Sequence, residues 1–363
     1  MKPKIRNSVG IVKIENGIVE IFKGNIRKSF FYKISDNVID MILNLDGTLT
    51  LEEISIKYNL DTISFNLFKK LIFNLVSKGI IIDNSDTGLN KYKEIYHRVI
   101  SMLEDYSTNT DDIYKAWNNI LNSKVLIIGL GGVGSWIALN LVQSGVKNIV
   151  LMDNDVVDIS NLHRQWGYTE ADIKKFKTEV LKNRLLQINS MSNIEIINEY
   201  LDENILYKLK LNDIDLVINC ADFPNVDVTS EIISSYCMKN SINHIIAGGY
   251  NKHISLIGQT ILPFQTACYK CFDIQLKEKY NIKIKNMKKL MIQDRKIGSL
   301  GPMCTISASL TSMDAIKTLS KLIPPTNINR RGEFDIYTMN IEYLKFEKLE
   351  DCPWCGRNGI YKK

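Results

Sequence analysis

Long apolar runs are missing from this chain of 363 residues. None reaches the ~18 residues that a helix needs to span a bilayer, so we expect no membrane-spanning segment and no membrane partner. The first ten residues, MKPKIRNSVG, contain no apolar stretch of the signal-peptide type, which predicts a cytoplasmic protein. With 45% hydrophobic and 24% charged residues, the composition is that of a globular chain with two or three domains.

A strong charge imbalance is also missing. The net charge of +6 is modest for this length, and no basic segment carries the interleaved aromatic residues of a nucleic-acid-binding module. We therefore expect no nucleic-acid partner and interpret the positive charge as ordinary surface charge.

The clearest motif begins with residues 124–128, an apolar and β-branched run typical of a strand buried on both faces. Residues 135–143 have the pattern of an amphipathic helix. Between them, three glycines form G-x-G-x-x-G: Gly129, Gly131 and Gly134. In this motif the first glycine makes the turn, the second lets the backbone approach a phosphate, and the third lets helix and strand pack closely. Strand, turn and helix together predict a phosphate site at the helix N-terminus, and a turn that binds nothing is the alternative.

A second strand, residues 147–152, ends at Asp153, where an acid can bind a ribose hydroxyl. Dinucleotide enzymes share everything up to this point, so the following residues must decide which nucleotide binds. These are Asp155, Asn161, Arg164, Gln165, Lys175 and Lys177. A triphosphate needs more cations than a nicotinamide pyrophosphate and also a metal-holding acid. The cationic residues favour ATP, and an NAD-dependent oxidoreductase is the alternative.

The stretch from Asp153 to Gln165, D-N-D-x-V-x-x-S-N-L-x-R-Q, followed by Lys175 and Lys177, resembles the adenylating domain of the ubiquitin-activating-enzyme superfamily. That superfamily includes the ThiF and MoeB-like proteins, which activate a C-terminal carboxylate as an acyl-adenylate. The resemblance runs from about residue 95 to the C-terminus. One position differs, because relatives usually have Gly-Lys-x-Lys where this chain has Lys174-Lys175-Phe176-Lys177. The departure lies at position 174, and both lysines are kept.

The resemblance also implies roles for these residues. Arg164 and Lys177 would neutralise charge that grows on the phosphate oxygens, and Asn161 and Gln165 would orient those oxygens. Asp155 and Lys175 would complete the nucleotide site.

Two more residues take roles from the resemblance. Asp222 follows a predicted strand, residues 214–220, and would hold Mg²⁺, whereas capping the helix that begins near Asn225 is the alternative. Arg98, in a predicted helical arm, would reach the nucleotide of a partner subunit, which implies a homodimer. A solvated helix arginine is the alternative there.

The segments after Lys177 alternate between helical and strand patterns. Such alternation predicts a mostly parallel, doubly wound, Rossmann-like α/β sheet with its ligand crevice at the carboxyl ends of the strands. We also expect one strand over residues 254–263. The predicted divisions are residues 1–84, a linker and helical arm at 85–121, and the adenylating domain at 122–363.

Two C-x-x-C pairs lie far apart in the sequence: Cys268 and Cys271, then Cys352 and Cys355. Each such pair aims two thiolates at one point, so together they predict a closed, structural Cys₄ zinc site. A pair of disulfides is the alternative, and it is disfavoured in a reducing compartment.

Many relatives carry an enzyme-bound thioester on a cysteine in or near a crossover loop, which corresponds to residues 273–300 here. That loop has no cysteine. It is rich in basic residues: Lys277, Lys279, Lys283, Lys285, Lys288, Lys289, Arg295 and Lys296. These could cover phosphates, bind an acidic peptide end or simply face solvent. We interpret Cys220, Cys237 and Cys304 as packing residues, so a covalent relay is disfavoured.

Residues 1–84 form a separate predicted unit. Asn16-Gly17 between two β-rich runs predicts a hairpin over residues 9–22, and three helical segments follow at 36–45, after Thr50, and at 62–77. This order is typical of a winged-helix-type fold and resembles the small PqqD-like peptide-clamp domains. A DNA-binding winged helix and a purely structural lid are the alternatives.

A peptide clamp, an adenylating domain without a thioester cysteine and a Cys₄ site together resemble the microcin C-type, MccB-like peptide nucleotidyltransferases. That resemblance implies ATP, Mg²⁺ and Zn²⁺ as cofactors and a short ribosomal precursor peptide, ending in Asn, as substrate. A sulfur-carrier adenylyltransferase of the ThiF or MoeB type and a non-catalytic, peptide-presenting partner protein remain alternatives.

Overall fold

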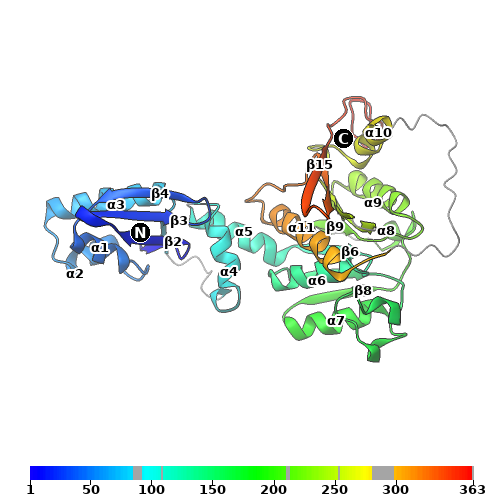
Figure 1. The fold of residues 1–363 in the computed structure, drawn as a ribbon, viewed down its shortest axis with the longest axis horizontal. Helices are drawn as coiled ribbons and strands as arrows, with labels where there is room; N and C mark the ends of the chain where they lie inside the picture. Colours follow the sequence, from blue (N-terminus) through cyan, green and yellow to red (C-terminus); the bar gives the residue numbers. More distant parts are fainter. Residues whose placement is uncertain (85–91, 108, 210–212, 252–253, 280–297, 362–363) are drawn as a thin grey trace. The chain divides into compact units, whose positions relative to one another are not determined.

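The computed structural model describes all residues except 85–91, 108, 210–212, 252–253, 280–297 and 362–363. The chain divides into two compact units, Met1–Asn119 and Ile120–Lys363 (Figure 1). Most of the basic loop predicted at residues 273–300 lies outside the described residues.

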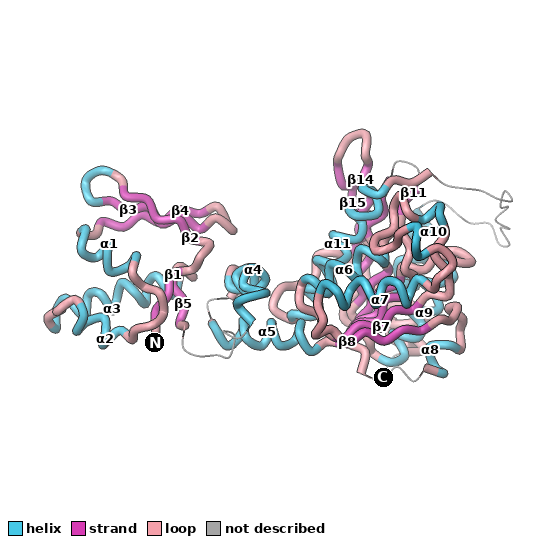
Figure 2. Tube along the Cα trace, turned by 90° about the horizontal axis from the view of Figure 1, so that it is seen from below, coloured by secondary structure: helices cyan, strands magenta, loops and turns pink. Residues whose placement is uncertain are grey.

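The first unit combines small sheets with helices. Its elements are β1 (Pro3–Ile5), β2 (Val9–Lys13), β3 (Ile18–Lys23), β4 (Lys28–Lys33), α1 (Asp36–Leu43), α2 (Leu51–Lys57), α3 (Thr62–Ser77), β5 (Ile81–Asp83), α4 (Lys93–Glu104) and α5 (Thr110–Asn122), within which the unit boundary falls. The strands β2, β3 and β4 form an antiparallel sheet in that order, and β1 pairs with β5 (Figure 2). The third sheet strand, β4, was not expected from the sequence.

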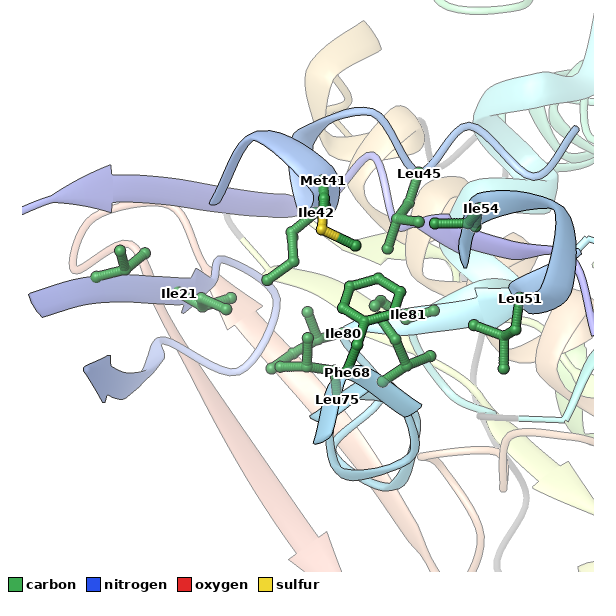
Figure 3. Close-up of a cluster of buried hydrophobic side chains, with 12 residues drawn as sticks. Ile21, Met41, Ile42, Leu45, Leu51, Ile54, Phe68, Leu75, Ile80 and Ile81 are labelled. Atoms are coloured by element: carbon green, nitrogen blue, oxygen red, sulfur yellow. The ribbon is translucent and has the colours of Figure 1, made fainter. Parts of the chain in front are cut away.

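Local sequence explains several of these elements. Asn16 and Gly17 both have positive φ, 65° and 72°, which the predicted hairpin turn requires. Thr50 and Glu53 form the predicted capping box at the start of α2, and Asp61 caps α3. The apolar faces of α1, α2 and α3 meet in one buried cluster around Phe68, which Figure 3 shows.

The second unit is built on a six-stranded sheet. Its elements are β6 (Lys124–Ile128), α6 (Gly134–Gln143), β7 (Asn148–Met152), α7 (Lys177–Ile188), β8 (Asn193–Ile197), α8 (Ile205–Lys208), β9 (Leu216–Asn219), α9 (Val226–Asn240), β10 (Asn243–Ile246), β11 (Tyr250–Asn251), β12 (Ile254–Ile257), β13 (Gln259–Ile261), α10 (Tyr269–Lys279), α11 (Gly301–Ser320), β14 (Arg330–Asp335) and β15 (Asn340–Lys345). The sheet order is β13-β10-β9-β6-β7-β8, and every pairing except that of β13 is parallel.

Helices cover both faces of this sheet. Leu126 and Ile128 of β6, with Val150 and Met152 of β7, pack against α8 and α9 on one face. The helices α6, α7 and α11 pack side by side, with α6 against β6 and α7 against β7 and β8 (Figure 1). The doubly wound fold is thus confirmed. The order of chain connections reverses between β6 and β9, and in such sheets a reversal point is where ligands bind.

The prediction of a single strand over residues 254–263 was wrong. The structure has two strands, β12 in a four-stranded sheet with β11, β14 and β15, and β13 at the edge of the large sheet. Gly258 lies between them, and a Cβ there would come within 1.7 Å of the Ile246 carbonyl oxygen. The chain therefore changes sheets at a position where only glycine fits. Among the described residues, no helix is long and apolar enough to cross a membrane.

Candidate nucleotide site and four-cysteine cluster

The glycine loop follows β6 directly and approaches the end of β9. Gly129 has φ of +87°, and a Cβ there would come within 2.6 Å of the Ala221 amide nitrogen. A Cβ at Gly134 would lie 1.9 Å from the Gly129 carbonyl oxygen. These two glycines are therefore required by the turn and by close packing. Gly131 differs, since its nearest neighbour would be Gln165 Nε2 at 3.8 Å, so its open side is free of backbone contacts among the described residues.

Asp153, at the end of β7, holds the glycine loop by hydrogen bonds. Its carboxylate accepts from the Leu130 amide at 2.6 Å and from the Asp155 amide at 2.8 Å. Burial raises the pKa of this carboxyl, while the charge of Lys177 and the two amides act to lower it. The acid is thus fixed beside the loop, as a ribose-binding group would need to be.

Lys177 is the first residue of α7 and its side chain is almost fully buried, at 6% exposure. Its Nζ lies 2.7 Å from Asp155 Oδ2, and its backbone amide donates to the Asp155 carbonyl oxygen at 3.0 Å. The Asp155 side chain is 57% exposed, so one end of this pair opens to solvent. Asp153, Asp155 and Lys177 therefore form one charge cluster at the carboxyl end of β7.

The next loop presents the predicted arginine. Asp158 and Asn161 form a capping box around a short 3-10 helix, Ile159–Asn161, and the Asn161 carbonyl accepts from the amides of Arg164 and Gln165. The Arg164 guanidinium donates to the Ser160 carbonyl oxygen at 2.7 Å. Gln165 is buried, and its Oε1 has no hydrogen-bond partner among the described residues. Sequence reasoning placed Asn161 on the phosphates, but the structure also gives its side chain this capping role.

In the Lys174–Lys177 loop, a lysine adopts a backbone conformation that usually favours glycine. Lys174 has φ of +73°, in the left-handed region that glycine favours. Its amide donates to the Val157 carbonyl, and the Val157 amide donates to the Lys175 carbonyl, both at 2.9 Å. Lys175 points its Nζ to Asp172 Oδ1 at 3.2 Å. The substitution at position 174 therefore leaves the loop intact at some cost in strain.

Asp222 lies just after β9, at the same end of the sheet, and is exposed. Asn225 caps α9 with its own side chain, accepting from the Val228 amide, so the helix does not need Asp222 as its cap. Asn219 fixes this turn, because its Oδ1 accepts from the Ala221 amide at 3.0 Å. The charge of Asp222 adds to burial in raising the pKa of the Cys220 thiol.

Arg98 is an exposed residue of α4, in the first unit. The residues around the glycine loop all belong to the second unit, so the role predicted for Arg98 stays a prediction.

The four cysteines of the two C-x-x-C pairs meet as predicted. All four are buried, their sulfurs lie within 4.8 Å of one another, and none forms a disulfide. Three sulfur pairs, Cys268–Cys271, Cys268–Cys352 and Cys271–Cys355, are 3.8, 3.6 and 3.4 Å apart. Four sulfurs placed about 2.3 Å from a common metal ion would be about 3.8 Å apart. This cluster can therefore hold a tetrahedral metal ion.

Residues 106–354 match the ThiF family, and this match covers more than half of the chain. The chain belongs to the ThiF family. A curated relative, the sulfur carrier protein ThiS adenylyltransferase of Escherichia coli K12, is 31% identical over 65% of this chain and 87% of that protein. The molybdopterin-synthase adenylyltransferase of the same organism is 29% identical over 65% and 88%. The predicted enzyme class, an adenylyltransferase, is thereby confirmed, and ATP binding fits this family.

Solved structures extend the likeness to nearly the whole chain. A crystal structure of E. coli MccB with AMPCPP and MccA superposes with a TM-score of 0.75, covering 98% of this ThiF-family chain and 100% of MccB at 24% identity. A crystal structure of PaaA gives a TM-score of 0.73 over 94% and 99% at 22% identity. The predicted fold class, an adenylating domain preceded by a small winged-helix-type domain, agrees with this likeness.

Several residues that hold the loops of the candidate site together were missed by sequence reasoning. Asp172 accepts from Thr169, Lys175 and Arg184. Burial raises the pKa of its carboxyl, but the hydrogen bonds from Thr169 and Lys175 outweigh burial and hold the pKa below its usual range. The spacing Thr169-x-x-Asp172 is a capping-box signal that could have been recognised. Ser135 and Tyr168, which contact the glycine loop, carried no such signal.

The strained backbone at Lys174 leads to a prediction about stability. Lys174→Gly removes the left-handed strain of about 1 kcal/mol, which offsets the extra entropy of glycine in the unfolded chain. We expect a melting temperature equal to or above that of the wild type. Lys182→Gly, within α7, is the matched control and should cost about 1 kcal/mol. Equal losses of stability for the two variants in thermal unfolding would contradict the strain at Lys174.

Proposed function

We propose that this ThiF-family enzyme activates the C-terminal carboxylate of a short ribosomal peptide, ending in Asn, as an acyl-adenylate and yields a nucleotide-linked peptide of the microcin C type. The observation that carries the proposal is the fold likeness to MccB, which includes the first unit as well as the second. The sulfur-carrier relatives, in contrast, account for only 65% of the chain. Structures of MccB with the peptide MccA, with ATP and with a succinimide are among the similar folds.

In the proposed reaction the peptide carboxylate attacks the α-phosphate of ATP and pyrophosphate leaves. Negative charge then grows on the non-bridging oxygens, and fixed positive groups at that place usually contribute most to catalysis. Arg164 and Lys177 would supply this charge, since both lie at the carboxyl ends of the strands. Lys177 would exchange its contact with exposed Asp155 for a phosphate oxygen.

The remaining site residues would bind and orient the nucleotide. Asp153 would accept from the ribose, as its fixed position beside the loop allows. Gln165, whose side-chain Nε2 is the nearest atom to the open side of Gly131, would donate to the phosphates through this amide nitrogen. Asp222 would hold Mg²⁺, which supplies further positive charge to the phosphates when bound. Arg98 would complete the site of a partner subunit in a homodimer.

The first unit would hold the peptide. In its sheet order, β2-β3-β4, the strand β4 is an edge, and Tyr32 of β4 donates to Asn74 of α3 at 3.0 Å. This edge therefore runs beside a helix, as in the peptide-recognition mode where an extended segment adds one strand to a sheet. Phe31 on β4 and Phe73 on α3 are 63% and 50% exposed and offer apolar contacts to such a segment.

We further propose that the cysteine cluster binds Zn²⁺ in a structural role. Four thiolates fill a tetrahedral shell, so no position is open for a reacting water. The site would fix the C-terminal segment at residues 352–355 to the start of α10.

A sulfur-carrier adenylyltransferase is the second candidate, because the ThiS adenylyltransferase of E. coli is 31% identical over 242 residues. Mass spectrometry separates the two. Purified protein is incubated with Mg²⁺, each nucleoside triphosphate and synthetic peptides ending in Asn or Gly-Gly, with pyrophosphate release followed in parallel. A stable nucleotidyl mass on the Asn peptide supports the proposal. Turnover only with the Gly-Gly ending favours the sulfur-carrier candidate, and peptide binding without pyrophosphate release favours a non-catalytic partner protein.

The proposed roles of Arg164 and Asp222 give a prediction about activity. Arg164→Ala and Asp222→Ala should each lower turnover by roughly 10²-fold or more. Arg164→Ala removes a positive charge that would stabilise the transition state, and Asp222→Ala removes the proposed ligand of the Mg²⁺ that would supply further positive charge. Melting temperatures should stay near the wild-type value, since both side chains lie at the surface of the site. The matched controls Arg357→Ala and Glu203→Ala, exposed residues elsewhere, should keep normal turnover. Near-normal turnover in both site variants would overturn the assignment.

The zinc proposal predicts one bound Zn²⁺ per chain in the purified protein. Cys352→Ser should lose this metal and a large part of the stability, since apparent binding free energies of structural zinc are on the order of 10 kcal/mol. Cys237→Ser, a buried cysteine outside the cluster, should keep the metal. Elemental analysis and thermal unfolding measure both effects, and full metal content in Cys352→Ser contradicts the ligand assignment.

A further inference from the structure

Two neighbouring carbonyl groups of the glycine loop are anchored by side chains. The Tyr168 hydroxyl donates to the Leu130 carbonyl oxygen at 3.0 Å. The Ser135 hydroxyl donates to the Gly131 carbonyl oxygen at 2.8 Å, where the Ser135 amide also donates at 3.1 Å. Tyr168 is 7% exposed and Ser135 is fully buried, so neither hydroxyl has water as an easy alternative partner.

Anchoring a carbonyl also orients the amide that follows it. The peptide unit is planar and trans, so its C=O and N–H point in opposite directions. With the Leu130 oxygen held by Tyr168, the Gly131 N–H must point away from Tyr168. With the Gly131 oxygen held by Ser135, along the axis of α6, the Gly132 N–H must point out of the N-terminal end of that helix.

The space into which these amides point has the properties of an anion site. Neither the Gly131 nor the Gly132 amide has a protein acceptor among the described residues. A Cβ at Gly131 would meet nothing closer than Gln165 Nε2 at 3.8 Å, so a ligand can approach the backbone. The preceding amide, that of Leu130, is instead bound to Asp153, which separates the ribose side of the loop from the phosphate side.

The same two side chains connect the glycine loop to the arginine loop. Ser135 Oγ accepts from the Trp166 amide at 3.0 Å while it donates to Gly131, and Tyr168 lies four residues beyond Arg164. Trp136 adds a third contact, because its indole N–H donates to the Arg164 carbonyl oxygen at 3.2 Å. These contacts therefore hold the backbone of the arginine loop, at Arg164 and Trp166, against the start of α6 and the glycine loop.

We propose that Tyr168 and Ser135 are positioning residues that orient the Gly131 and Gly132 amides toward the phosphate groups of ATP and hold the Arg164 loop in register with them. The proposal deepens the proposed function and rests on its ATP site. Neither side chain would touch the nucleotide, so both act through the backbone.

The test compares binding of ATP and of adenosine, which lacks the phosphates, by calorimetry on the full-length zinc-loaded protein. Tyr168→Phe and Ser135→Ala remove only the anchoring hydroxyls. We expect each to weaken ATP binding roughly tenfold and to change adenosine binding less than twofold. Ser135→Thr, which restores a hydroxyl, should recover part of the ATP affinity.

Two matched controls report the purely structural cost of such a deletion. Tyr269→Phe removes another 7%-exposed tyrosine hydroxyl that donates to a backbone carbonyl, that of Asp227. Ser312→Ala removes a helix serine that also donates to the carbonyl four residues before it and accepts from a second segment. Both controls should keep wild-type affinity for ATP.

Each outcome is decisive. Loss of ATP affinity in the site variants alone supports the proposal. If a site variant loses as much affinity for adenosine as for ATP, or if the controls lose as much ATP affinity as the site variants, the positioning role is overturned. The proposed ATP site itself is not contradicted by either result. A wild-type protein that binds adenosine but no ATP overturns the proposed function itself, and the inference with it.

Discussion

The site depends on one partly buried carboxylate, that of Asp153. It accepts hydrogen bonds from the Leu130 amide of the glycine loop and from the Asp155 amide after β7, so it fixes both segments to the end of the sheet. A buried anion is costly unless hydrogen bonds and a counter-charge compensate it. Lys177 supplies that charge from the start of α7 while pairing with Asp155. Two acids therefore share one buried lysine, and the cluster has no surplus positive charge before a nucleotide binds.

This balance has a consequence for the proposed reaction. A triphosphate brings several negative charges to a place where Lys177 is already paired with Asp155 and Lys175 with Asp172. Binding must then either move these lysines from carboxylate to phosphate or bring a divalent ion. Asp155 and Asp222 are both exposed. Water can therefore solvate the Asp155 carboxylate when Lys177 moves to a phosphate, and the Asp222 carboxylate when no Mg²⁺ is bound. Under the proposed function, Mg²⁺ would supply positive charge that the paired lysines do not.

Much of the second unit could be predicted from the sequence because its signals are local. Gly129 and Gly134 are required by close contacts with residues nearby in the sequence or on the neighbouring strand. Within each C-x-x-C pair, the short spacing alone brings two sulfurs to one point. The prediction of one strand over residues 254–263 was wrong because this apolar run contributes strands to two different sheets. Only the close contact between Gly258 and the Ile246 backbone shows where one strand ends and the next begins. Ser135 and Tyr168 could not be found at all, since their partners are backbone carbonyls that no side-chain pattern reveals.

The described cysteines limit what can happen to an acyl-adenylate formed here. Cys220 lies beneath the glycine loop, close to where Gly129 and Gly134 pack, yet burial and the charge of Asp222 raise the pKa of its thiol. Burial likewise raises the pKa of the Cys237 thiol. The four cysteines of the two C-x-x-C pairs lie together in the candidate metal site. A thiolate is the nucleophilic form of cysteine, so neither Cys220 nor Cys237 is suited to accept the acyl group. Cys304 is also buried, at 0% exposure. Under the proposed function the adenylate therefore reacts with the side-chain amide nitrogen of the peptide's own C-terminal Asn. AMP leaves as this ring closes, so a second nucleoside triphosphate must supply the nucleotide of the final product.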